Sequence, residues 1–333
     1  MLQELFRIPG THISIHGYGL MLVIGFLLAI QLAKFLAVRS GIDPELFVNA
    51  GLLALVTGVI GARVSHVFEN WSQYTDPHRS AFDNFKDAIN LTSGGLTYYG
   101  GFLLATPSLI AYAIYKRVPL RTGMDIVAPA LMIGLGIGRV GCFLNGCCYG
   151  AECTLPWAVR FPYYSNAYIE QYRAQEIQPE KELLMDTPLG RQLKDPETAE
   201  RDGLKKLMAA ERLKVHAVHP AQLYSTITAL LLAAIFVAFY SMPHVPGHVF
   251  ALMCILEGAT RFLLELLRVE PGVGPAIGGM ALSLSMWIGV GLVITGVILW
   301  VVFNKFGGLN QGGSEVEQSS SRVGFPVAVK SSH

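Results

Sequence analysis

Charged side chains interrupt three of the apolar stretches in this 333-residue chain. Arg63 lies three residues before His66, Arg139 lies among glycines, and Arg261 precedes Glu265 by four residues. A charge near the centre of a membrane helix costs at least about 2.5 kcal/mol on insertion scales, so it requires a partner, a cavity or a function. Side chains four residues apart share one helix face, so Arg261 and Glu265 can pair. A structural ion pair and a functional role are equally open for these two, whereas Arg63 is expected to be structural or interfacial.

Arg139 belongs to the most informative stretch of the chain, residues 134–150, which reads GLGIGRVGCFLNGCCYG. Glycines let helices approach closely or let backbone amides face a ligand, and an arginine among them can hold a phosphate through two parallel hydrogen bonds. The alternative is a glycine-rich packing seam with an arginine that extends to the membrane interface. A second glycine cluster, residues 94–101, opens another apolar stretch at the same predicted membrane face. Together these features suggest a pocket for a lipid head group.

Four of the five cysteines lie close together in the sequence, at Cys142, Cys147, Cys148 and Cys153, and the fifth is Cys254. Adjacent cysteines fit no common zinc-binding spacing, so we predict neither a metal site nor a cofactor. A disulfide could form among Cys147, Cys148 and Cys153 if they face an oxidising compartment. The sequence does not choose the partners.

Composition indicates that a bilayer surrounds these residues. The chain is 52% hydrophobic and 15% charged, whereas soluble domains are about 25% charged. Its net charge of +1 gives no support to nucleic-acid binding. About 20 apolar residues cross the hydrocarbon core as a helix, and open strands are excluded there. We therefore predict an all-α integral membrane protein with about seven spans. The predicted spans are residues 15–38, 47–68, 96–115, 124–142, 220–240, 247–267 and 280–303.

Lysines and arginines in short loops predict the orientation of the bundle. The loop at residues 116–121 is the most basic, so it is expected in the cytoplasm, with the N-terminus outside and the C-terminus inside. Residues 1–303 then form the catalytic bundle, with a polar extracytoplasmic insert at 151–219. Within this insert, residues 199–214 are typical of an amphipathic surface helix or a small soluble lobe, and the lobe is favoured. The Gly- and Ser-rich residues 304–333 are predicted to be a disordered cytoplasmic tail.

The order of these motifs resembles that of the prolipoprotein diacylglyceryl transferase family. The resemblance extends from His16 to about Ser285, without the charged insert. The matching stretches are residues 14–21 (SIHGYGLM), 61–63 (GAR), 94–101 (GGLTYYGG), 125–129 (DIVAP), 138–150 (GRVGCFLNGCCYG), 156–162 (PWAVRFP), 219–224 (HPAQLY) and 261–265 (RFLLE). Their shared order on a chain of seven apolar stretches makes coincidence very improbable.

The resemblance implies a bacterial inner-membrane enzyme that begins lipoprotein maturation. Such enzymes transfer the diacylglyceryl group of phosphatidylglycerol to the lipobox cysteine of a prolipoprotein signal peptide and release glycerol phosphate. By motif position, Arg139 and Arg261 resemble two essential arginines, and Glu265 would orient Arg261. The remaining residues that the resemblance assigns to the site are Tyr99 for catalysis and Tyr18, Gly100, Cys142, Gly150 and His219 for substrate binding.

Several positions depart from the family pattern. The histidine usual before the final glycine pair of residues 94–101 is Tyr99, and a phenol with a reference pKa of about 10 is a poor base at neutral pH. Cys142 and Cys147 replace an asparagine and a glutamate, Glu257 replaces a tyrosine, and Ala281 replaces a glutamine. These departures leave the general base unassigned.

Other interpretations of the proton acceptor and of the function therefore stay open. His219 and His66 are candidate proton acceptors, although a histidine before a proline at a helix start is as often structural. A divergent paralogue acting on another lipid or acceptor, and a noncatalytic lipid-binding membrane protein, are the alternative functions. A transporter is disfavoured because no inverted repeat is visible.

Overall fold

The computed structural model describes residues 4–7, 14–75, 80–90, 95, 97–187, 190–268 and 282–306. These residues belong to two compact units, one made of residues 1–29 and 128–333 and the other of residues 30–127. Most of the predicted tail, residues 307–333, lies outside the described residues.

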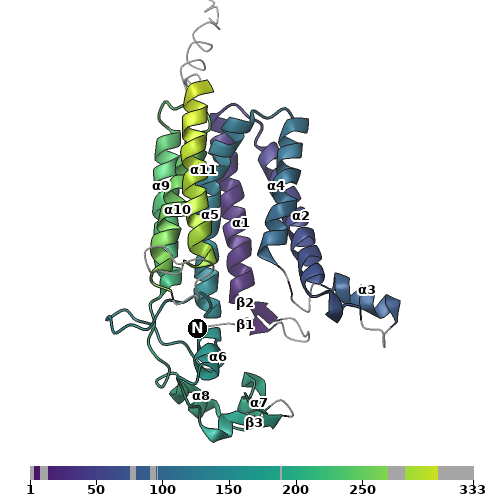
Figure 1. Ribbon diagram of the computed structural model, residues 1–333, viewed down its shortest axis with the longest axis vertical. Helices are drawn as coiled ribbons and strands as arrows, with labels where there is room; N and C mark the ends of the chain where they lie inside the picture. The colour runs from purple at the N-terminus through teal and green to yellow at the C-terminus, as the bar shows by residue number, and fades with distance from the viewer. Residues whose placement is uncertain are drawn as a thin grey trace, which may run out of the picture. The chain divides into compact units, whose positions relative to one another are not determined.

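Eleven α-helices account for most of the described chain (Figure 1). Each predicted apolar stretch contains one long helix, with ends that differ from the prediction by a few residues. The long helices are α1 (Gly17–Arg39), α2 (Glu45–Glu69), α4 (Tyr98–Tyr115), α5 (Leu120–Asn145), α9 (Ala221–Tyr240), α10 (His248–Glu265) and α11 (Leu284–Phe306). The shorter elements are α3 (Ala81–Ile89), α6 (Asn166–Arg173), α7 (Pro196–Arg201), α8 (Lys205–Glu211), the 3-10 helices η1 (Trp71–Gln73) and η2 (Lys181–Leu183), and two antiparallel hairpins, β1 (Glu4–Arg7) with β2 (Ser14–His16) and β3 (Leu184–Thr187) with β4 (Gly190–Leu193).

Five of the long helices, α1, α2, α5, α9 and α11, are long and apolar enough to cross a membrane. α4 is a shorter apolar helix, and α10 carries three charged residues, Glu257, Arg261 and Glu265. The chain is therefore a mostly α-helical, multi-pass membrane protein. The total of seven spans stays a prediction.

Close helix contacts in the first unit depend on glycine. Where α10 meets α11, a Cβ on Gly258 would lie 2.6 Å from the carbonyl oxygen of Gly289, which is closer than side chains tolerate. α5, α9 and α10 share an apolar core, and the hydroxyl of Thr226 donates a hydrogen bond of 3.1 Å to the carbonyl of Gly136. Members of that core include Ala128, Met132, Leu232, Ala233, Phe236, Val249, Met253 and Cys254. These contacts fix the helix ends that carry the polar residues of this unit.

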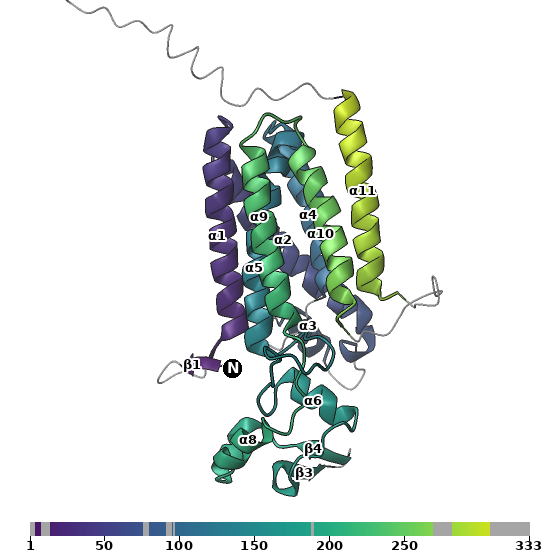
Figure 2. The same ribbon diagram turned by 90° about the vertical axis from the view of Figure 1, so that its left-hand side faces the viewer.

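Residues 151–219 contain α6, the β3–β4 hairpin, α7 and α8, which lie beyond the ends of α5 and α9 in both views (Figure 2). They enclose an apolar cluster of their own: Tyr163, Tyr168, Ile177, Leu183, Leu193, Ala199 and Val215. The Tyr168 hydroxyl donates to the buried carboxylate of Glu211 at 2.8 Å. Burial, and then this hydrogen bond, raise the pKa of Tyr168. These contacts pack α6, the β3–β4 hairpin and α7 around one apolar cluster.

The single amphipathic helix considered for residues 199–214 is wrong in detail, because two short helices occupy this stretch. Gly203 has a φ of +77°, and its amide donates to the carbonyl of Glu200 while that of Leu204 donates to the carbonyl of Ala199. This pattern is a Schellman motif, which ends α7. α8 then starts in a new direction.

In the second unit, α2 and α4 pack against each other through small residues. A Cβ on Gly61 would lie 2.4 Å from the carbonyl oxygen of Gly100, and a Cβ on Gly100 would lie 2.2 Å from the Cβ of Ser65. Only glycine permits this approach, so Gly100 has a packing role whether or not it also contacts substrate.

Candidate active site

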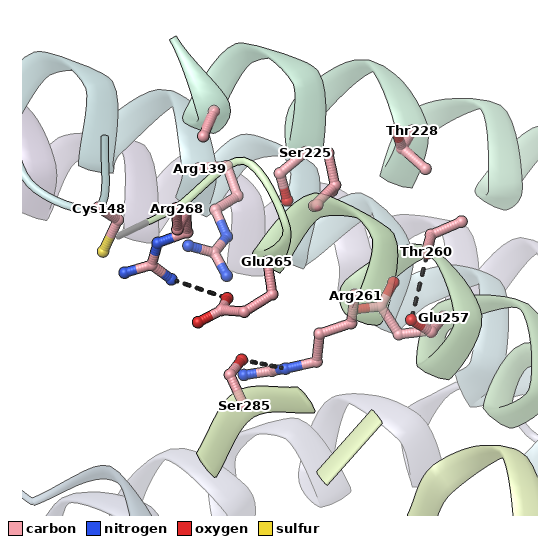
Figure 3. Close-up of a pocket in the computed structure, with 12 residues that line it drawn as sticks. Arg139, Cys148, Ser225, Thr228, Glu257, Thr260, Arg261, Glu265, Arg268 and Ser285 are labelled. Carbon is pink, nitrogen blue, oxygen red and sulfur yellow. Dashed lines mark hydrogen bonds and ion pairs between the residues drawn. The ribbon is translucent and has the colours of Figure 1, made fainter. Parts of the chain in front are cut away.

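A polar pocket lies in the unit of residues 1–29 and 128–333 (Figure 3). Its walls come from α5 and the turn that follows it, from the first two turns of α9, from the last turns of α10, and from the start of α11. The lining residues are Arg139, Cys148, Ala221, Ser225, Thr228, Glu257, Thr260, Arg261, Leu264, Glu265, Arg268 and Ser285. Three arginines and two glutamates thus face one small space.

Arg139 extends into this pocket from α5. The predicted span of 124–142 puts Arg139 close to the end of the helix. In the structure α5 continues to Asn145, so Arg139 lies inside the helix. Its side chain is half-buried, and it makes no hydrogen bond or ion pair with any residue that the structure describes. Its donors are therefore available to a ligand.

α10 contributes a stripe of charged residues at intervals of four: Glu257, Arg261 and Glu265. This interval places them on one helix face. The Nε of Arg261 donates to the hydroxyl of Ser285 on α11 at 3.2 Å. The close α10–α11 contact thereby sets the direction of the Arg261 guanidinium (Figure 3).

The sequence suggested that Glu265 pairs with Arg261, but Glu265 has other partners in the structure. The Glu265 carboxylate is 4% exposed; it accepts a hydrogen bond of 3.0 Å from Ser283 and pairs with Arg268 at 3.3 Å. Arg268 lies in the turn after α10, where its amide donates to the carbonyl of Glu265 at 3.0 Å, whereas Arg261 extends toward Ser285 of α11. The predicted ion pair was therefore wrong in its partner, and Arg268 is a pocket residue that sequence reasoning missed.

The chemistry of the pocket suits an anion with several oxygens. Guanidinium groups donate paired hydrogen bonds to phosphate and stay charged, and Glu265 holds one of them without occupying the others. Sequence comparison agrees with this chemistry, because residues 3–302 match the family model described as prolipoprotein diacylglyceryl transferase. The chain belongs to the prolipoprotein diacylglyceryl transferase family. The resemblance seen in the motifs is thus confirmed, and the chain is a transferase.

Three curated members of the family align with this chain over most of their length. A phosphatidylglycerol–prolipoprotein diacylglyceryl transferase of Corynebacterium glutamicum is 30% identical over 274 residues, covering 81% of this chain and 74% of that protein. Proteins of the same name from Methylobacillus flagellatus and Clostridium tetani are 28% identical over 303 residues and 25% identical over 300 residues. These alignments cover 87% and 90% of this chain and 92% and 97% of the relatives.

Tyr18, Gly150 and His219, which the family resemblance assigns to substrate binding, lie in the same unit as the pocket but do not line it. The ring of Tyr18 packs over α5, where a Cβ on Gly141 would lie 3.1 Å from its Cδ2. The amide of Gly150 donates to the carbonyl of His219 at 2.9 Å, and the ring of His219 lies 3.3 Å from the hydroxyl of Tyr224. His219 thus has structural partners at both its backbone and its ring.

Cys142 lies in the last turn of α5, and its thiol gathers with those of Cys147 and Cys148. All five cysteines are free thiols in the structure, so the disulfide considered from the sequence is not formed. Of this group, Cys148 lines the pocket.

Tyr99 and Gly100 belong to the other unit, at the start of α4. Tyr99 is 48% exposed, whereas Gly100 is buried against α2. Position 99 thus carries a half-exposed phenol where the family pattern has a histidine.

Arg63, in the same unit as Tyr99, has the structural role that the sequence predicted. It is 5% exposed and donates to the carbonyls of Asp87, Ala88 and Gly95 at 2.6, 2.7 and 3.0 Å. Its guanidinium also lies 5.3 Å from the centre of the Tyr74 ring. Arg63 therefore joins α2 to the end of α3 and to the turn before α4.

Proposed function

We propose that this member of the family transfers the diacylglyceryl group of phosphatidylglycerol to the lipobox cysteine of a prolipoprotein, forming a thioether and releasing glycerol phosphate. Family membership supports the reaction class, and the names of the curated relatives contain both substrates. The observation that carries the proposal is the pocket in which Arg139, with no described partner, faces Arg261 and Arg268.

The reaction needs charge stabilisation more than a strong nucleophile. The thiolate sulfur attacks the glyceryl carbon that bears the phosphate ester, so a carbon–sulfur bond forms while the carbon–oxygen bond to phosphate breaks. Negative charge builds on the departing phosphate oxygen. Donors from Arg139 and Arg261 would stabilise that charge more in the transition state than in the ground state.

The proposal also gives a role to each of the remaining site residues. Glu265 positions Arg268 and, through the shared pocket, limits repulsion among the arginines. Tyr18, Gly100, Cys142, Gly150 and His219 contact the lipid or the peptide, and Tyr99 acts as a hydrogen-bond donor. The thiol proton passes to a base as the carbon–sulfur bond forms.

The same proposal places the chain in a bacterial inner membrane with seven spans. The connection between α4 and the first turn of α5 carries Lys116, Arg117 and Arg121. This basic connection is expected on the cytoplasmic side. The N-terminus and residues 151–219 would then be outside, where an exported prolipoprotein presents its lipobox, and the tail would be inside. Labelling of a cysteine introduced within 116–122 by an impermeant reagent added to intact cells would overturn this orientation.

Turnover by the purified protein tests the function directly. The full-length protein in phosphatidylglycerol micelles, supplied with a lipobox peptide, should yield lipidated peptide and glycerol phosphate in equal amounts. A peptide with serine in place of the lipobox cysteine is the acceptor control, and phosphatidylethanolamine micelles are the donor control. Turnover only with another lipid would identify a paralogue, and lipid binding without turnover would identify a noncatalytic protein.

A further inference from the structure

Three thiols gather at the rim of the arginine pocket. The sulfur atoms of Cys142, Cys147 and Cys148 all lie within 4.8 Å of one another. The sequence spacing does not reveal this arrangement, because Cys147 and Cys148 are adjacent and Cys142 lies five residues before Cys147. Folding of the turn after α5 back over the helix end brings the three together.

The backbone of this turn is built to hold the thiols in place. Gly146 and Cys148 both have left-handed backbone conformations, with φ of +72° and +61°. Cysteine adopts that region at a cost, so a non-glycine residue there signals a constraint imposed by its surroundings. The amide of Gln222, which is 1% exposed, donates to the carbonyl of Cys147 at 2.7 Å. A buried side chain of α9 therefore anchors the turn that carries two of the thiols.

We propose that Cys142, Cys147 and Cys148 together bind one thiophilic metal ion, Zn²⁺ or Cu⁺, at the rim of this pocket. Zinc–thiolate bonds of about 2.3 Å place the sulfurs of one tetrahedral site roughly 3.8 Å apart, which the observed cluster accommodates. Thiolate sets select soft or borderline cations over Mg²⁺ or Ca²⁺.

Positive charge near the thiol cluster favours the metal-bound state. Three thiolates on Zn²⁺ carry a net charge of −1, from three negative charges and two positive. Cys148 lines the pocket together with Arg139 and Arg268, and the three side chains lie near one another in Figure 3. The arginines can thus offset the excess negative charge.

Metal binding would also affect the reaction, a consequence that rests on the proposed function. A metal–thiolate group beside Arg139 and Arg268 competes electrostatically with an incoming phosphate. The loaded protein should therefore turn over several-fold more slowly than the metal-free protein.

The test begins with the reduced, metal-free, full-length protein in detergent. Co²⁺ is added as a spectroscopic probe, and Zn²⁺ or Cu⁺ is then added to displace it. We expect one Co²⁺ per chain with a thiolate-to-cobalt charge-transfer band, and the displacing ion identifies the preferred metal. The Cys142→Ser/Cys147→Ser/Cys148→Ser variant should lose the band, while Cys153→Ser and Cys254→Ser, which change thiols outside the cluster, should keep it.

The metal site is refuted if the reduced protein shows no charge-transfer band, or if the folded triple variant keeps an undiminished band. If the triple variant does not fold by thermal-unfolding criteria, Cys147→Ser alone replaces it and should lose about a third of the band intensity. Recovery of a cluster disulfide that blocks metal binding even after reductant is added would also refute the site. Turnover is compared after desalting, so that free metal cannot bind the peptide thiol. A protein that binds metal but never turns over would refute the proposed function and leave the metal site intact.

Discussion

Arg63 and Arg139 are both arginines within long apolar helices, yet they have opposite surroundings. Arg63 is almost fully buried and donates to three main-chain carbonyls. Arg139 is half-buried, lines a pocket and has no hydrogen-bond or ion-pair partner among the described residues. The helix sequence around each is rich in small residues, so composition does not separate them.

The two arginines differ in the hydrogen-bond acceptors that surround their guanidinium groups. α3 ends beside α2, and the carbonyls of Asp87 and Ala88 in its last turn accept hydrogen bonds from Arg63. Arg139 makes no hydrogen bond or ion pair with a described residue, although Glu257 and Glu265 line the same pocket, which also holds two more arginines. An intramembrane arginine without protein acceptors is costly unless a ligand supplies them. Arg139 is thus suited to binding, and Arg63 to structure.

Arg139→Lys should produce the largest loss of activity. Lysine keeps the charge but cannot reproduce the planar, two-bond contact with phosphate, so we expect kcat/KM to fall by about a hundredfold. Peptide lipidation by the purified variant measures this loss. Arg201→Lys, at an exposed residue of α7, is the matched control and should behave as the parent. Parental activity in Arg139→Lys would show that this side chain only supports the helix.

Arg63→Lys should affect stability and spare the chemistry. An ammonium cannot reach all three carbonyls, so unpaired acceptors should cost about 1 to 3 kcal/mol. At roughly 2 to 4 °C per kcal/mol, the thermal unfolding midpoint should fall by several degrees. Activity per folded molecule should stay within about twofold of the parent. A large loss of activity at an unchanged midpoint would remove the contrast with Arg139.

The sequence predicts the helices better than it predicts the partners of their charges. Apolar length alone located every long helix, because membrane helices satisfy their own backbone hydrogen bonds. It also singled out Arg139 and Arg261, and both line the same pocket. The sequence does not decide between Arg261 and Arg268 as the partner of Glu265, because they lie four residues before it and three residues after it, and both intervals can bring side chains together. The choice depends on Ser285, which accepts from Arg261 across the α10–α11 contact. The thiol cluster was missed because it arises from a left-handed turn, which no spacing rule describes.

Glu265→Gln should have an intermediate effect on the arginine pocket. Glutamine can still accept from Ser283 but no longer pairs as an ion with Arg268, so we expect kcat/KM to fall about tenfold. A double-mutant cycle that adds Arg268→Met measures the coupling between the two. Coupling of Glu265 to Arg261 in place of Arg268 would contradict the observed pairing.

Tyr99→Phe should lower activity less than Glu265→Gln does, and it tests whether the unit of residues 30–127 contributes more than structure. If its hydroxyl only donates a hydrogen bond, Tyr99→Phe should lower turnover several-fold, in line with a net contribution of about 1 kcal/mol per hydrogen bond. Tyr99→His should keep activity, because imidazole also donates and fills much of the same space. Turnover of both variants is measured across pH after each is shown to be folded. Complete loss in Tyr99→Phe, with parental activity that rises toward pH of about 10, the reference pKa of a phenol, would instead make the phenolate the base. In that case the second unit, and not only the arginine pocket, would carry part of the chemistry.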